Sequence, residues 1–228
     1  MDTGDALIGG GVLGDKTKGE VIIAGMNLMA YDAMALGPKE LSLGPDLLHQ
    51  RMEEASFPLL SANVVLSGTE ELVARPYVIL ERGGHRLGVI GLTRALDRPL
   101  AGFQVLDPQQ AAARYVPEVG RQAGVVILLT NLPYPTALSL ADAVPGIDLV
   151  VAALPGQLPR QVGRAPTTGT LAVTAEQPVA KHTGRQVGCL VVTVGADGGL
   201  SLVSWEIRPM NGQIADDPQM KALLNRYR

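Results

Sequence analysis

Few aromatic residues, few charges and almost no cysteine are present, and each scarcity narrows what the protein can be. Aromatic residues make up only 4% of the 228 positions, so Val, Leu, Ile, Ala and Met must build the core. The single cysteine, Cys189, excludes an internal disulfide, and its apolar neighbours predict a buried core thiol. Hydrophobic residues make up 46% and charged residues 18%, which excludes a chain disordered by composition.

A basic surface and a long apolar segment are also missing. The formal net charge is -3 and the arginines are scattered, so we expect no nucleic-acid partner. The longest apolar runs, such as residues 125–129 and 147–154, are far shorter than the ~20 residues that cross a bilayer. The N-terminus lacks the charged-then-apolar pattern of a secretory leader, so we expect a soluble chain with no membrane span and no signal peptide.

Helical and strand patterns alternate through the first half, which predicts a layered α/β domain. We expect helices at residues 18–30, 45–55, 108–119 and 135–144, and strands at residues 33–36, 59–63, 77–80, 86–90, 125–129 and 147–152. The prolines of residues 154–169 predict a loop. Strands at residues 171–175, 187–194 and 200–207 and a helix at residues 216–227 complete the prediction.

Several blocks, in chain order, resemble the 5'-nucleotidase branch of the calcineurin-like metallophosphoesterase superfamily. Residues 26–40 (MNLMAYDAMALGPKE) resemble the segment that leads into its Gly-Asn-His-Glu motif, and residues 2–5 (DTGD) resemble its Gly-Asp motif. Further similar blocks are FPLLSANV at 57–64, GHRLGVIGLT at 84–93 and GIDLVV at 146–151. The resemblance spans nearly the whole chain and implies the family's α/β/β/α sandwich.

The same resemblance implies that the family's two-metal site is degenerate here. Asp5 matches the bridging Asp of the Gly-Asp motif and is the only matching ligand. Pro38 stands where the family has its Asn ligand, and its side chain has no donor atom. Lys39 stands at the position of the catalytic His and precedes Glu40.

Three later histidine ligands are also replaced. Asn131 falls where a His is expected at the end of a strand, and Leu154 and Gly156 fall on the two histidines of the Gly-His-Thr-His motif. A metal pair needs several carboxylate or imidazole ligands on each ion. We therefore predict that the site binds no metal and no other cofactor and contains no catalytic residue.

Two features near this vestigial site remain open to interpretation. The Lys39 ammonium could pair with Asp5 in place of the lost cation, or it could point into solvent. The glycines Gly9, Gly10 and Gly11 could form an anion-binding nest of backbone N–H groups, although a flexible rim loop is the simpler interpretation. The three histidines have no ligand spacing, and no Gly-x-Ser-x-Gly elbow supports serine catalysis.

The sequence thus predicts one metallophosphoesterase-like domain over residues 1–228, without the C-terminal substrate domain that family members carry. The family's first strand, with its Asp-x-His motif, would lie upstream of residue 1. Its absence would leave a strand edge open to a homodimer partner. The resemblance also implies a bacterial, extracytoplasmic protein.

The leading hypothesis is a catalytically inactive module that binds or scaffolds an unknown protein or small-molecule ligand. The alternative is a phosphohydrolase, a 5'-nucleotidase or related phosphoesterase, with an unconventional or partner-completed site.

Overall fold

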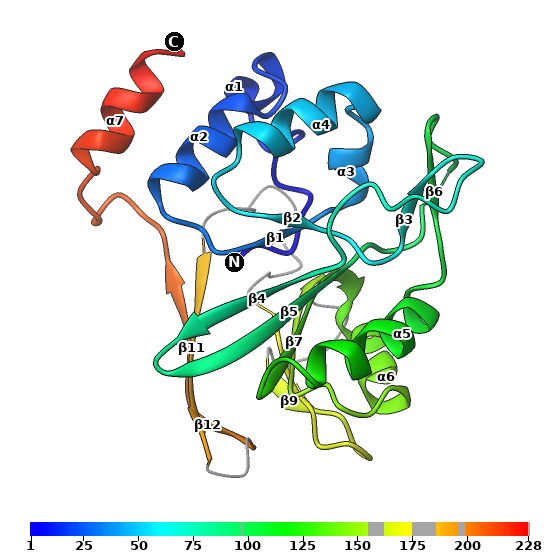
Figure 1. Cartoon of the computed structure of the whole chain (residues 1–228). Helices are drawn as coiled ribbons and strands as arrows, with labels where there is room; N and C mark the ends of the chain where they lie inside the picture. The colour runs from blue at the N-terminus through cyan, green and yellow to red at the C-terminus, as the bar shows by residue number, and fades with distance from the viewer. Residues whose placement is uncertain (97, 155–161, 175–185, 196–198, 228) are drawn as a thin grey trace.

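The computed structural model describes residues 1–96, 98–154, 162–174, 186–195 and 199–227, which form an α/β/β/α stack of layers (Figure 1). The helices of this part are α1 (Val12–Lys16), α2 (Glu20–Leu28), α3 (Pro38–Leu41), α4 (Pro45–Glu54), α5 (Pro108–Gly120), α6 (Tyr134–Ala143) and α7 (Pro218–Asn225). Its strands are β1 (Met34–Ala35), β2 (Leu59–Leu60), β3 (Val64–Leu66), β4 (Tyr77–Arg82), β5 (His85–Leu92), β6 (Phe103–Val105), β7 (Val125–Pro133), β8 (Leu149–Leu154), β9 (Val162–Arg164), β10 (Leu171–Val173), β11 (Gln186–Val194) and β12 (Leu200–Pro209). The predicted α/β sandwich is confirmed.

The central sheet has the strand order β4-β5-β7-β8-β10-β9. Strands β5, β7, β8 and β10 run parallel, whereas β4 and β9 pair antiparallel at the two edges. Parallel neighbours need a crossover connection, which α5 provides between β5 and β7 and α6 between β7 and β8. Residues 125–132 of β7 are all buried, as expected for a parallel strand covered on both faces.

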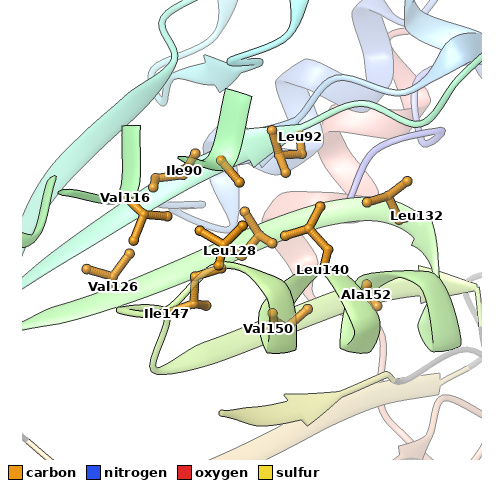
Figure 2. Close-up of a cluster of buried hydrophobic side chains, with 14 of the residues drawn as sticks. Ile90, Leu92, Val116, Val126, Leu128, Leu132, Leu140, Ile147, Val150 and Ala152 are labelled. Atoms are coloured by element: carbon orange, nitrogen blue, oxygen red, sulfur yellow. The ribbon is translucent and has the colours of Figure 1, made fainter. Parts of the chain in front are cut away.

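One face of this sheet is covered by α5 and α6. Figure 2 shows Leu128 and Val150 of the sheet pointing toward Val116 of α5 and Leu140 of α6. Close packing of α5 on β5 depends on Gly88, because a Cβ there would overlap Val119 Cγ1. In this core, branched side chains of the sheet pack against mostly alanine and tyrosine side chains of α5 and α6, together with Val116, Val119 and Leu140.

The opposite face is covered by a second β layer made of two separate pieces. One is the parallel pair β1-β2, beside which Asp2 bridges to Met34. The other is the antiparallel hairpin β11-β12, from which Leu190 and Trp205 pack toward the central sheet. Helices α2 and α4 lie outside β1 and β2, and α7 packs against α2 (Figure 1).

Several local predictions were wrong. Helix α1, which follows the glycine loop, was not predicted, nor was α3, which begins at Pro38, where a missing N–H costs nothing at a helix start. Strand β9 lies within the predicted loop at residues 154–169. Cys189 is half-buried because β11 belongs to a two-stranded piece of sheet.

The helix predicted at the C-terminal end is confirmed as α7. Asp217 caps it by accepting hydrogen bonds from the backbone N–H groups of Gln219 and Met220, and Pro218 occupies its first position. No helix among the described residues combines the length and the apolar character needed to cross a membrane.

Candidate vestigial metal site

The chain segments that carry the predicted site residues meet at one end of the β layers. The segment after β1, the loop after β5 and the end of β7 come together with the N-terminal segment at residues 2–5. A Cβ on Gly4 would lie 2.6 Å from Ala35 O, 2.8 Å from Gly37 N and 3.2 Å from Asn131 Nδ2. Only glycine fits such an approach, so the DTGD segment packs directly on both strand ends.

Asn131 ties three of these segments together. Its side chain is 1% exposed, and Oδ1 accepts a hydrogen bond of 2.7 Å from the backbone N–H of Arg94. Its Nδ2 donates to Leu36 O at 2.7 Å and to Thr3 O at 3.3 Å. Both ends of the amide are therefore engaged with backbone groups, which explains why a neutral donor and acceptor side chain suits this position.

Glu40 is fully buried and holds the N-terminal segment. Its Oε2 accepts from the backbone N–H groups of Asp5 at 2.7 Å and Gly37 at 2.9 Å. Its Oε1 accepts from Ala6 at 2.9 Å and Leu7 at 3.0 Å. Burial raises the pKa of Glu40 to about 7, with the nearby charge of Asp5 acting in the same direction and the backbone hydrogen bonds opposing it.

Asp5 lies next to Glu40 and has a left-handed backbone conformation, with φ of 61°. Its Oδ1 accepts a hydrogen bond of 2.8 Å from the backbone N–H of Lys39. A Cβ on Gly37 would come within 2.5 Å of Asp5 Oδ1, so the loop after β1 can only approach this carboxylate because residue 37 is glycine. Asp5 stays half-buried rather than enclosed.

The hypothesis of an ammonium substitute for the cation is wrong. In the described part of the chain, no ion pair joins the Lys39 ammonium to Asp5; only the backbone N–H of Lys39 contacts that carboxylate. The Lys39 side chain instead runs along the glycine loop, where a Cβ on Gly9 would lie 3.4 Å from Nζ. Pro38 begins α3 and adds no donor atom to the site.

The glycine loop itself is exposed. The backbone N–H of Gly9 donates to Asp15 Oδ1 at 2.6 Å, so this donor is already used within the loop. Cβ atoms on Gly10 and Gly11 would meet nothing within 4 Å, so crowding does not require glycine at either position. An anion nest at Gly9–Gly11 stays a prediction.

The remaining predicted positions lie toward β8. The backbone of Leu154 pairs with Pro133, which places the end of β8 next to the end of β7. Gly156 lies outside the described residues, as does His182. His49 is exposed and contacts Glu53 at 3.3 Å on α4, so it is no part of this site.

A polar network that the sequence interpretation missed supports the same strand ends. Asn63 Oδ1 accepts from the backbone N–H of Thr93 at 2.8 Å, and its Nδ2 donates to Thr93 O and Leu106 O at 2.8 and 2.9 Å. Thr93 Oγ1 in turn donates to Leu36 O at 2.8 Å. The signal was available, because Asn63 follows a buried apolar run in which a lone amide needs partners.

This donor set does not fit a pair of divalent metals. Among the residues described, no three His, Cys, Asp or Glu side chains converge as a metal centre. The Glu40 oxygens each accept two N–H groups and the Asn131 amide is engaged at both ends, so neither can turn toward an ion without breaking these bonds. Among the described residues Asp5 is the carboxylate that matches the bridging ligand of the family, and one matching ligand does not hold a metal pair.

Comparison with known proteins agrees with this architecture. A probable 5'-nucleotidase of Treponema pallidum is 32% identical over 160 residues, covering 66% of this chain and 27% of that protein. The crystal structure of a 5'-nucleotidase precursor from Thermus thermophilus matches 99% of this chain and 48% of its own, with a TM-score of 0.82 and 28% identity. The calcineurin-like phosphoesterase YfkN of Bacillus subtilis shares the fold, with a TM-score of 0.72 and 23% identity over 99% of this chain and 81% of its own.

These similarities have a defined extent. No family model matches the chain. The matched part of the chain spans less than a third of the length of the first curated relatives. The match nevertheless extends over the whole layered fold, including both β layers and the loops that meet around Asp5. The chain is therefore similar in sequence to 5'-nucleotidases and shares the fold of a calcineurin-like phosphoesterase.

Proposed function

We propose that residues 1–228 form a metal-free, catalytically inactive 5'-nucleotidase-like domain that acts as a binding or scaffolding module. One observation carries this proposal: Glu40 and Asn131 use all of their polar atoms to hold backbone segments together. Beside them, Pro38 offers no side-chain donor, and Asp5 is a half-buried carboxylate whose Oδ1 accepts the backbone N–H of Lys39. The arrangement stabilises the fold where its relatives would be expected to hold metals.

The rival hypothesis is a phosphohydrolase with an unconventional or partner-completed site, and activity measurements separate the two. Purified protein should be incubated with 5'-AMP, 5'-UMP and p-nitrophenyl phosphate in the presence of Mn²⁺, Co²⁺ or Zn²⁺. We expect phosphate release equal to that of the buffer, and no stoichiometric metal after dialysis.

Contaminating phosphatases are controlled by two variants. Asp5→Ala removes the one matching ligand, and Asp216→Ala removes an exposed carboxylate far from it in sequence. Turnover that is present in the wild type and in Asp216→Ala but lost in Asp5→Ala would establish an enzyme and overturn the inactive-module hypothesis.

A binding role is supported by strand edges of the second β layer that have no partner strand among the described residues. Hairpin β11-β12 forms a sheet of its own, and its exposed apolar residues include Val187 at 50% and Val203 at 60%. Open strand edges can pair with another chain, so we propose that self-association proceeds through this layer. Light scattering after size exclusion tests it: a monomer at all concentrations contradicts the homodimer. The extracytoplasmic location that the family implies is part of the same proposal.

A further inference from the structure

Away from the vestigial site, two neighbouring hollows that share Met52 lie beside α4, and together they are called the groove. Two cavities of about 360 and 300 Å³ open against this helix, and Met52 lines both of them. The first lies between α4 and the segment after β3, and the second between the end of α4 and the residues that lead into β2. Figure 1 shows α4 on the outer side of β2.

The floor of the groove is apolar and incompletely covered. Met52, Leu66 and Val73 line it, and each is half-buried at the margin of the cluster beneath α4. Such side chains already contact the core on one side and keep an uncovered apolar surface on the other. An apolar group that fills the groove would remove this surface from water.

The two ends of the groove carry opposite charges. Asp46 and Glu71 line the first cavity, with no Lys or Arg among its lining residues. Arg75 is the charged residue that lines the second cavity. In the described residues none of these three side chains forms an ion pair with another group of the chain. Their charges are therefore available to a ligand.

We propose that this groove binds an extended segment of another polypeptide, with a Lys or Arg at the Asp46–Glu71 end, an Asp or Glu at the Arg75 end, and apolar residues between them over Met52. The chain rises roughly 14 Å between Asp46 in the first turn of α4 and Ala55 at its C-cap, which line the first and the second cavity, and this matches about four residues of extended chain. A short peptide spans this distance, whereas a free amino acid does not. The inference goes beyond the proposed function and holds whether or not the site around Asp5 is inactive.

Fluorescence polarisation with capped, labelled peptides tests the proposal on the whole chain. Lys-Leu-Val-Glu is expected to bind at low salt, and Gln-Leu-Val-Gln to bind about tenfold or more weakly, since two partly exposed ion pairs each contribute roughly two- to fivefold. Asp46→Asn with Glu71→Gln, and separately Arg75→Gln, each remove one of the two ion pairs and should each weaken binding of Lys-Leu-Val-Glu by roughly two- to fivefold. Matched controls are Glu70→Gln and Arg86→Gln, two exposed residues outside the cavity linings, which should leave binding unchanged.

Three results would overturn the proposal. The first is no binding of Lys-Leu-Val-Glu at millimolar concentration, and the second is equal binding of the charged and neutral peptides. The third is complete displacement of the labelled peptide by an equal concentration of free lysine, which would indicate a small-amine site rather than a peptide groove. Because all of the substituted residues are exposed, circular dichroism should show that each variant keeps its fold.

Discussion

Replacing Asn131 with leucine tests whether the former ligand position now holds the fold together. Leucine has a similar size but no polar atoms, so packing is largely kept while the hydrogen bonds are removed. The backbone N–H of Arg94 loses its 2.7 Å acceptor, and Leu36 O loses one donor but keeps Thr93 Oγ1. One unsatisfied N–H costs about 1–3 kcal/mol and each net hydrogen bond about 0.5–1.5 kcal/mol. We expect Asn131→Leu to lower the free energy of unfolding by about 2–4 kcal/mol.

Urea unfolding followed by far-UV circular dichroism and by the fluorescence of Trp205 provides the measurement. With a urea dependence of about 3 kcal/mol/M, the midpoint should fall by roughly 1 M. The matched control is Asn211→Leu, the same substitution at an exposed position, which should change stability by less than about 0.5 kcal/mol. A loss below about 1 kcal/mol in Asn131→Leu, with coincident transitions, would refute the view that this amide fastens three segments.

Two further predictions concern packing and ionisation. Gly88→Ala should lower the free energy of unfolding by about 1–3 kcal/mol, because the new methyl group overlaps Val119. The control is Gly120→Ala, whose Cβ meets nothing within 4 Å and which should not lower it. Equal effects of the two substitutions would contradict the packing argument. Folding raises the pKa of Glu40 from 4.5 to about 7, so the folded chain binds more protons than the unfolded chain in that window. Wild-type stability relative to Glu40→Gln should therefore fall by up to about 3 kcal/mol as pH rises from 4.5 to 7; a difference independent of pH would exclude this titration.

The elements that the sequence predicted well are those with strong local signals. The strand predicted at residues 125–129 and the Asp-Pro starts of α5 and α7 all appear in the structure. These features were predictable because a strand buried on two faces and a capped helix start each depend on residues that are adjacent in the sequence. The short pieces β9 and β3-β6 were missed. Each has three residues per strand, so no periodicity marks it and only tertiary pairing defines it.

At the site, the resemblance named residues whose side-chain contacts it could not predict. Asp5, Glu40 and Asn131 do lie on adjoining segments. The Lys39 hypothesis failed because it treated the position as a charge alone, whereas the first turn of α3 presents a backbone N–H to the carboxylate. Whether the backbone N–H or the ammonium of Lys39 reaches Asp5 depends on the orientation of α3, and the residue type alone does not determine that orientation.

The separation of the second β layer into two pieces has a consequence for local opening. Amides of β7 are bonded within a sheet of six strands and buried on both faces, so their hydrogen exchange should require global unfolding. The hairpin β11-β12 is held by its two strands and by one packed face, with Val187 and Val203 left exposed. Its amides should therefore exchange before those of β7, through a local opening that leaves the central sheet intact.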